Sequence, residues 1–137
     1  MTKIFVNGCF DLLHRGHLAL LNHAKSQGDY LLVAIDSDQR VAQHKGSSRP
    51  VNDQITRKII LENLKAVDQV KIFAGDQELI DIIQAYQPDV MIVGGDWRGR
   101  SVIGSQYAKS LVFFDRIDDE STTKTIENYL DRRHLSR

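Results

Sequence analysis

The stretch "FVNGCFDLLHRGHLALL" (residues 5–21) decides how the start of this chain folds. An apolar run ends at Asn7-Gly8, and a helical pattern of apolar residues runs from about His17 to Gln27, before Gly28 as a C-terminal cap. The sequence "HRGH" (residues 14–17) lies at the junction of the two patterns. We therefore expect a strand, a polar turn rich in histidine, and a helix, in that order.

The rest of the chain alternates short apolar runs with helical periodicity. Strands are predicted at residues 3–6, 30–36, 69–73, 89–93 and 110–114. Further helices are predicted from Asp53 (with Ile55, Ile59, Ile60 and Leu64 on one face), around Leu79 to Tyr86, and from Ser121 as an N-cap. Residues 37–52 are expected to form a polar loop with one helical turn at most. This order predicts one α/β domain over residues 1–137: a Rossmann-like, doubly wound, five-stranded parallel sheet with helices on both faces.

The composition excludes several classes of protein. The 18 basic and 18 acidic residues cancel, so the chain lacks the broad positive field of a non-specific nucleic-acid-binding protein. No apolar run approaches the roughly 18 residues of a membrane span, and Asn7-Gly8 interrupts any secretory signal. A single cysteine suits a reducing compartment. We expect a cytoplasmic protein that binds neither nucleic acid nor membrane.

Polar residues follow each predicted strand. They are Asn7 to Asp11, Asp36 to Asp38, Gly94 to Asp96, and Asp115 to Ser121. Ligands of doubly wound sheets bind beyond the carboxyl ends of the strands, where the strand order reverses. The sequence therefore predicts that these segments converge on one binding site.

The two histidines of "HRGH" suit an anion site. The first turn of a helix has unpaired N–H groups and the positive end of the helix dipole, and imidazoles add further donors. Gly8 is expected to allow a sharp turn, and Gly16 to leave room for a ligand. Two other interpretations stay open: surface histidines in a loop, or a zinc site completed by Cys9 or Asp11.

Two ordered motifs carry a family resemblance. The segment "GCFDLLHRGHLALLNHAKSQGDYLLVAIDSD" and the later "STTK" (residues 121–124) resemble the small cytidylyltransferase-like nucleotidyltransferases, with their H-x-G-H and S-T-T motifs. The resemblance covers essentially the whole chain and implies a single nucleotidyltransferase domain, residues 1–137. It implies that a substrate phosphate attacks the α-phosphate of a nucleoside triphosphate and releases pyrophosphate. It also implies a Mg²⁺ requirement and a homodimer.

The resemblance also implies roles for individual residues. The catalytic residues would be His14, His17 and Lys45, and the nucleotide-binding residues Asn7, Gly8, Cys9, Phe10, Asp11, Gly16, Gly94, Asp96, Ser121, Thr122 and Thr123. The phosphate acceptor would meet Asp36, Arg57, Trp97, Arg100 and Arg116, and Asp11 would hold the Mg²⁺. Some of these residues also have interpretations without a substrate contact. Lys45 would be a solvated loop lysine, Ser121 a helix cap, and Arg57 an exposed helical arginine. Cys9 would be a small residue that only occupies space in the loop.

The nucleotide is a choice between two branches of the family. "KGSSRPVN" and "KAVDQV" resemble adenylyltransferases that act on heptose 1-phosphate, whereas "GDWRGR" and Arg116 resemble glycerol-3-phosphate cytidylyltransferases. We expect ATP and a sugar 1-phosphate such as D-glycero-D-manno-heptose 1-phosphate, with CTP and glycerol 3-phosphate as the alternative. A non-catalytic nucleotide sensor on the same fold is the alternative of another class.

Overall fold

A computed structural model describes residues 1–115 and contains one five-stranded sheet. The strands are β1 (Lys3–Gly8), β2 (Tyr30–Asp36), β3 (Gln69–Phe73), β4 (Val90–Gly94) and β5 (Ser110–Phe114). Every pair of neighbours is parallel, and the order across the sheet is β3-β2-β1-β4-β5. The predicted five-stranded parallel sheet is confirmed.

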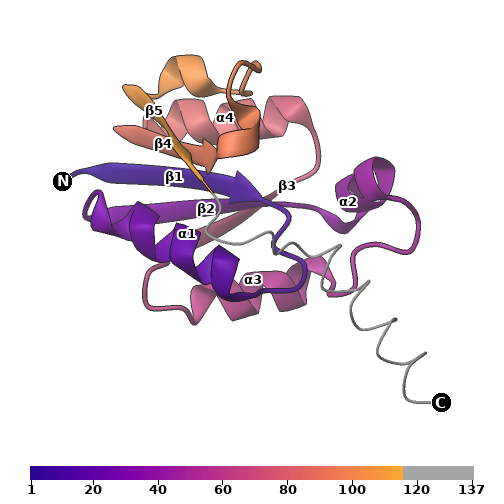
Figure 1. The fold of residues 1–137 in the computed structure, drawn as a ribbon. Helices are drawn as coiled ribbons and strands as arrows, with labels where there is room; N and C mark the ends of the chain where they lie inside the picture. Colours follow the sequence, from indigo (N-terminus) through magenta and orange to yellow (C-terminus); the bar gives the residue numbers. More distant parts are fainter. Residues whose placement is uncertain (116–137) are drawn as a thin grey trace.

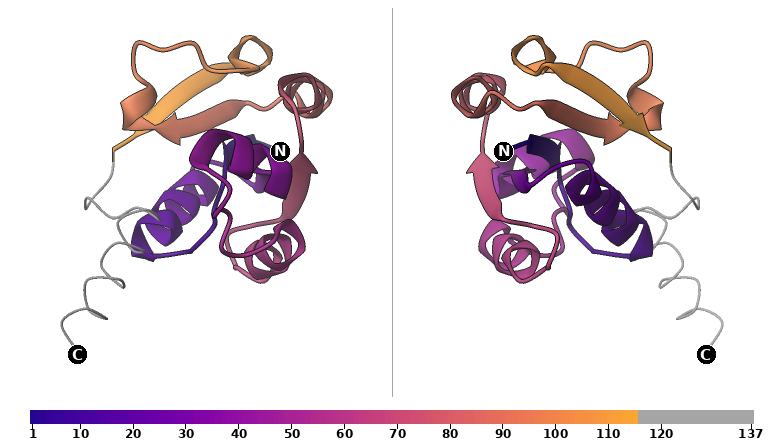
Figure 2. Two further views of the ribbon diagram at one scale, coloured as in Figure 1. Left: turned by 90° about the vertical axis from the view of Figure 1, so that its right-hand side faces the viewer. Right: turned by 90° about the vertical axis from the view of Figure 1, so that its left-hand side faces the viewer.

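Helices cover both faces of this sheet. The α-helices are α1 (Arg15–Ser26), α2 (Asp38–Lys45), α3 (Gln54–Glu62) and α4 (Asp76–Tyr86). Figures 1 and 2 show α1 and α3 on one face, α4 on the other, and α2 beyond the carboxyl ends of the strands. The buried apolar residues accordingly fall into two clusters, one on each side of the sheet. The predicted doubly wound α/β fold is confirmed.

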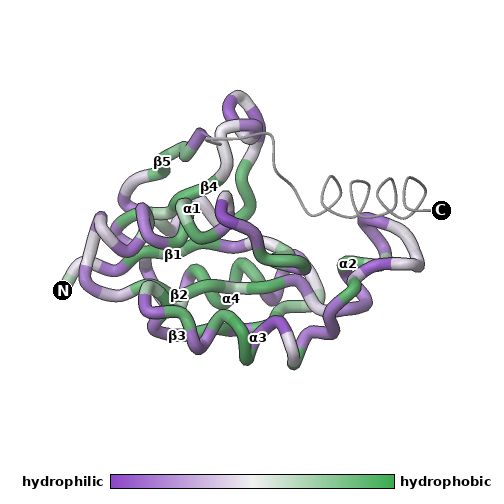
Figure 3. Tube along the Cα trace, turned by 60° about the horizontal axis from the view of Figure 1, so that its bottom comes forward, coloured by the Kyte–Doolittle hydropathy of each residue, from purple (hydrophilic) through white to green (hydrophobic). Residues whose placement is uncertain are grey.

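The central strands are apolar because both of their faces are buried. Leu31 to Ile35 of β2 are at most 1% exposed, and Figure 3 shows β2 and β4 in the hydrophobic colour. The chain leaves β1 for β2 on one side of the sheet and later reaches β4 on the other. The strand order therefore reverses between β1 and β4, which opens a crevice at the carboxyl ends of these two strands.

The helix boundaries differ from the prediction at α1. The helix begins at Arg15, two residues before His17, because the His14 side chain accepts a hydrogen bond from the Gly16 N–H and caps the helix. Gln27 is the C-cap in a right-handed conformation, and Gly28 follows it directly, with its N–H donating to the Lys25 carbonyl. A Cβ at Gly28 would lie 2.7 Å from the Thr2 carbonyl oxygen, so this glycine permits close packing against the start of the chain.

Helix α2 replaces most of the predicted loop over residues 37–52. Ser37 caps it by accepting a hydrogen bond from the Arg40 N–H, and Val41 is its one buried residue. A helix with a single buried residue has no apolar stripe to reveal it in the sequence. The cap and its contacts with neighbouring elements stabilise it instead.

The predicted core face of α3 is wrong. Ile55 and Ile59 are 57% and 53% exposed, whereas Arg57 and Leu61 are the buried residues of this helix. Periodicity identified the helix but not the side that faces the sheet. Within residues 1–115, no helix is long and apolar enough to cross a lipid bilayer.

Candidate active site

The crevice between the carboxyl ends of β1 and β4 contains a cavity of about 670 Å³. Its described lining includes Asn7, Gly8, Cys9 and Phe10 at the end of β1 and just after it; His14, Gly16 and His17 at the start of α1; Asp36, Arg40, His44 and Lys45 from β2 and α2; and Gly94, Asp96 and Trp97 at the end of β4 and just after it. The structure thus brings together most of the predicted site residues. Among residues 1–115, the predicted members that do not line the cavity are Asp11, Arg57 and Arg100.

The two histidines are part of the helix start. The His14 Nδ1 accepts from the Gly16 N–H at 3.1 Å, and the His17 Nδ1 accepts from the His14 N–H at 3.2 Å. The rings stack with centroids 4.0 Å apart. An Nδ1 that accepts a hydrogen bond has no proton, so both neutral imidazoles carry their proton on Nε2. Both rings therefore carry an Nε2–H donor on the edge away from these backbone bonds, and the His14 Nε2 is buried.

Gly8 and Gly16 make room for side chains. A Cβ at Gly8 would lie 2.9 Å from the Phe10 ring, and a Cβ at Gly16 would lie 2.8 Å from the His14 ring. Gly8 ends β1 and does not turn the chain sharply, so that expectation is wrong. In the loop after β1, Phe10 adopts a left-handed conformation with a φ of +50°. Its ring centroid lies 5.3 Å from that of His17. The glycines allow the aromatic and imidazole rings to pack together.

Opposite the histidines, α2 supplies a second side of the crevice, which we call the α2 wall: Asp36, Arg40, His44 and Lys45. Arg40 and His44 are spaced four residues apart and so share one face of α2, whereas Asp36 is the last residue of β2. Burial raises the pKa of Asp36 above its ordinary value, against the opposing effect of the Arg40 guanidinium, whose Nε lies 3.7 Å away. Arg40 and His44 were missed in the sequence because this segment was predicted as a loop; their i, i+4 spacing was the available signal.

The third side of the crevice follows β4. Gly94, Asp96 and Trp97 line it, and the cavity continues over the apolar side chains of Leu79, Val93, Val102, Ile103 and Phe114. The sequence analysis missed this apolar part, which no motif marks. Arg100 lies over the Trp97 ring at 5.8 Å and does not line the cavity, so its place in the acceptor site stays a prediction. An apolar slot beside small residues suits a flat base or a sugar ring.

Asp11 does not fit the predicted Mg²⁺ site. Its side chain is completely buried, and its carboxylate accepts from the Val51 and Asn52 N–H groups at 2.8 Å and from the Arg49 Nε at 3.2 Å. A carboxylate held by three donors and closed to solvent cannot also bind a hydrated cation. Within residues 1–115, no group of three His, Cys, Asp or Glu side chains could hold a metal.

Arg57 is likewise buried behind the crevice. Its guanidinium is completely covered and donates to the carbonyl oxygens of Cys9, Asp36 and Asn52 and to the Asp38 carboxylate. The expectation of an exposed helical arginine is wrong, and the guanidinium does not line the cavity from which a substrate contact was predicted. An internal arginine that donates four hydrogen bonds to separate parts of the chain holds those parts together.

Cys9 lines the cavity, but burial raises the pKa of its thiol above the ordinary value. A thiol is less nucleophilic when the thiolate is disfavoured, which agrees with the prediction that it fills the loop. The other predicted members, Arg116, Ser121, Thr122 and Thr123, lie outside the described residues. Their roles stay predictions, as do the roles of the residues that line the crevice.

The cytidylyltransferase-like family model matches residues 5–127. The chain belongs to the cytidylyltransferase-like family. The predicted resemblance to this family is thereby confirmed.

Similar proteins and structures agree with this assignment. The chain is 43% identical over 124 residues to the bifunctional protein HldE of Nitratiruptor sp. and 45% identical over 132 residues to that of Sulfurimonas denitrificans. These matches cover 90% and 96% of the chain but only 27% and 28% of the relatives, so the chain spans about a quarter of their length.

Solved structures share the fold. A lipopolysaccharide core biosynthesis protein from Thermoplasma volcanium superposes with a TM-score of 0.69 at 24% identity, over 86% of this chain and 99% of that one. Pantothenate synthetase from Thermus thermophilus superposes with a TM-score of 0.59 at 16% identity, over 87% and 57% of the two chains. At these identities the likeness concerns the fold alone.

Proposed function

We propose that this chain transfers a nucleoside monophosphate from a nucleoside triphosphate to a phosphate-bearing acceptor and releases pyrophosphate. The observation that carries the proposal is the pair of stacked imidazoles at the start of α1, both with Nδ1 accepting from the backbone. Their Nε2–H groups and the positive end of α1 would bind the triphosphate oxygens. Charge that develops as the phosphate bond breaks would meet donors already in place.

The reaction needs no covalent enzyme intermediate. An acceptor phosphate oxygen would attack the α-phosphorus, and the bond to the pyrophosphate oxygen would break. The protein would contribute alignment and charge stabilisation. Lys45 and Arg40 of the α2 wall would face the phosphates from the side opposite the histidines. The apolar slot beyond Gly94 would accommodate the base or the sugar.

For the substrates we propose ATP and a heptose 1-phosphate, with CTP and glycerol 3-phosphate as the alternative. The relatives named HldE, which match over 90% or more of the chain, support the first pair. The Mg²⁺ requirement stays a prediction, and no described residue is assigned as its ligand. The cytoplasmic location and the single domain over residues 1–137 also stay predictions.

A pyrophosphate-release assay tests this function. The protein is incubated with Mg²⁺, each of the four nucleoside triphosphates, and a panel of sugar 1-phosphates and polyol phosphates. We expect turnover with ATP and a heptose 1-phosphate. Turnover only with CTP and glycerol 3-phosphate would select the other branch, and nucleotide binding without turnover across the panel would favour the sensor. A His14→Ala, His17→Ala double variant serves as the control for contaminating activity.

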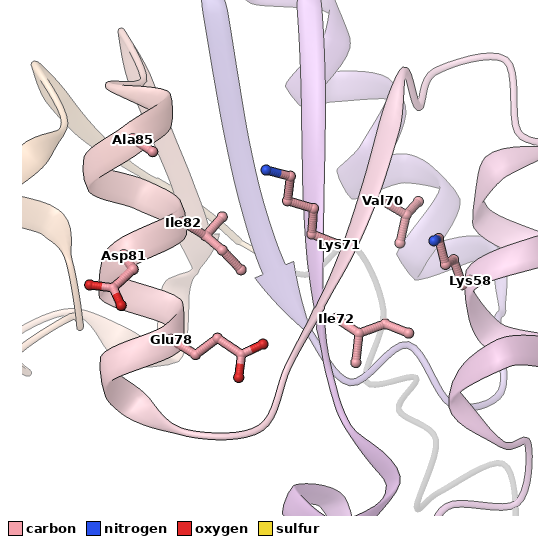
Figure 4. A pocket seen from close by; sticks show the side chains of 8 residues that line it. All are labelled: Lys58, Val70, Lys71, Ile72, Glu78, Asp81, Ile82 and Ala85. Atoms are coloured by element: carbon pink, nitrogen blue, oxygen red, sulfur yellow. The ribbon is translucent and has the colours of Figure 1, made fainter.

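We also propose that the chain forms a homodimer through α3 and the edge strand β3. The exposed Ile55 and Ile59 lie on α3, beside a shallow groove that runs along β3 between α3 and α4 (Figure 4). Lys58 and Lys71 line the α3 and β3 part of the groove, and Glu78 and Asp81 line the α4 side. In a two-fold symmetric pair the same surface meets itself, so the lysines of one copy can face the carboxylates of the other.

The oligomeric state tests the dimer directly. An Ile55→Ser, Ile59→Asp variant is expected to convert a dimer into a monomer in sedimentation analysis, because it places charge in an apolar contact. Leu18→Ser on α1 removes a comparably exposed apolar side chain and should leave the dimer intact. A wild-type protein that sediments as a monomer at micromolar concentration would refute the proposal.

A further inference from the structure

Asp11 and Arg57 are two buried charged side chains that lie behind the crevice and do not line it. Each is 1% exposed. Burial of a charge is unfavourable unless hydrogen bonds replace the lost water. The partners of these two residues therefore show which parts of the chain they connect.

Asp11 connects the loop after β1 to residues 49–52. Its carboxylate accepts from the N–H groups of Val51 and Asn52 and from Arg49 Nε. Its main-chain carbonyl accepts from the Asn52 side-chain amide at 3.1 Å. The segment after α2 is thus attached to the loop that contains Cys9, Phe10 and Asp11.

Arg57 donates hydrogen bonds to four residues in different parts of the chain. Its Nη1 donates to the Cys9 carbonyl at 2.9 Å and to the Asp36 carbonyl at 2.7 Å, and its Nε donates to the Asn52 carbonyl at 2.9 Å. Its Nη2 donates to the Asp38 carboxylate at 2.8 Å. One guanidinium therefore holds the loop after β1, the end of β2 and the start of α2.

These bonds hold the residues on both sides of Phe10. Arg57 binds the carbonyl of Cys9 before it, and Asn52 binds the carbonyl of Asp11 after it. Phe10 adopts a left-handed conformation that non-glycine residues avoid unless their surroundings impose it. Its ring is thereby placed against His17, at a centroid distance of 5.3 Å.

The same bonds fix both ends of the segment that contains Lys45. Asp38 at the start of α2 is held by Arg57, and Asn52 at the far end is held by Asp11. Residues 43–48 between these points are exposed. Lys45 therefore lies on a solvated stretch whose two ends are attached to the loop behind the histidines.

We propose that Asp11 and Arg57 form a buried clamp that positions the Phe10 ring behind His17 and fixes the base of the segment 38–52. Both are positioning residues for the transfer reaction and do not touch the substrates or the metal. The catalytic part of this inference rests on the proposed function. The structural part of the inference, which is the placement of the His17 ring, does not depend on the proposed function.

The test compares three variants. Asp11→Asn keeps the shape of the side chain but replaces one acceptor oxygen by an NH₂ group. Asn52→Ala is a milder change that removes the side-chain bond to the Asp11 carbonyl. Asp89→Asn is the matched control, because Asp89 also accepts a backbone N–H, from Lys3, at the opposite ends of the strands. The measurements are kcat, KM for the triphosphate, the Mg²⁺ concentration for half-maximal rate, and imidazole ¹⁵N NMR without ligand.

For Asp11→Asn we expect kcat to fall by about 10²-fold, as displacement of a catalytic group can produce. We expect the Mg²⁺ dependence to stay unchanged and the His17 ring signals to shift. Asn52→Ala should act in the same direction by a smaller factor. Asp89→Asn should lower thermal stability and leave kcat and the His17 signals unchanged.

Three results would overturn the clamp. A changed Mg²⁺ dependence with wild-type ring signals would assign Asp11 to the metal. Wild-type kcat and ring signals in folded Asp11→Asn would remove its positioning role. If Asp11→Asn does not fold, wild-type kcat and ring signals in Asn52→Ala would have the same meaning. Because the NMR signals need no turnover, failure of the proposed function would leave this measurement intact.

Discussion

The α1 and α2 sides of the crevice differ in how their side chains are held. On α1, His14 and His17 accept hydrogen bonds from backbone N–H groups, stack on each other and rest against Phe10. On α2, His44 and Lys45 are exposed at the end of a helix with a single buried residue. Donors that are already in place stabilise a transition state without reorganisation, whereas an exposed lysine must be ordered when the ligand binds. We infer that α1 governs kcat and α2 governs binding.

The largest effect expected from this comparison is that of His17→Ala. Loss of one donor to developing charge typically lowers kcat by about 10²–10³-fold. The variant also loses the acceptor for the His14 N–H, which should lower stability by about 1 kcal/mol. Pyrophosphate release and thermal unfolding measure both effects, and Asn22→Ala, at an exposed site on the same helix, is the control. Near-normal turnover in a folded His17→Ala protein would remove this residue from the mechanism.

Lys45→Ala should have a smaller effect, and mainly on KM. An exposed cation is screened by salt, so we expect a rise of about 10-fold in KM for the triphosphate that diminishes at high ionic strength. Steady-state kinetics at two salt concentrations check this result. Lys58→Ala, on α3, should leave KM unchanged. If Lys45→Ala lowers kcat as strongly as His17→Ala does, the contrast between α1 and α2 is wrong.

Gly16→Ala tests how tightly the α1 side is packed. Alanine is the better helix former, yet its Cβ would lie 2.8 Å from the His14 ring. We expect the ring to move and kcat to fall by roughly 2–10-fold. Gly75→Ala is the matched control, because nothing lies within 4 Å of a Cβ at that position. Equal kinetics for the two variants would show that the His14 ring tolerates displacement.

The smallest expected effect concerns Asp36 and pH. Burial raises the pKa of this carboxyl, so its contribution to folding is most favourable below its ordinary value of 3.8 and is lost as the pH rises through the folded value. Asp36→Asn should therefore increase the melting temperature at pH 7, with no gain below pH 3.8. Asp115 should affect folding stability with the opposite pH dependence, because its hydrogen bonds with Arg98 lower its pKa. Its favourable contribution is present above the ordinary pKa and is lost as the pH falls. Thermal melts from pH 3 to 8 distinguish the two carboxyls, and a destabilised Asp36→Asn protein at pH 7 would contradict this account.

The α1 side of the site could be predicted because its signals are local. A strand, a glycine, two histidines three residues apart and a helix follow one another within residues 3–26, so spacing alone placed both imidazoles at the helix start. The α2 side could not be predicted in the same way. Its helix has no apolar stripe, and its stability comes from Ser37 and from contacts with Arg57 and Gln54, which are distant in sequence. Arg40 and His44 were therefore missed.

The sequence by itself determined the order of strands and helices, the parallel sheet, and the edge at which the polar residues meet, because apolar periodicity and alternation of elements are local properties. Only the tertiary structure decided that Asp11 and Arg57 are internal and that the isoleucines of α3 face outward. Exposure depends on which elements pack together, and hydrogen-bond partners 38 to 48 residues apart in the chain leave no periodic trace. Residue type and spacing predicted a charged site, whereas three-dimensional packing separated the charges that line the crevice from those that hold its loops.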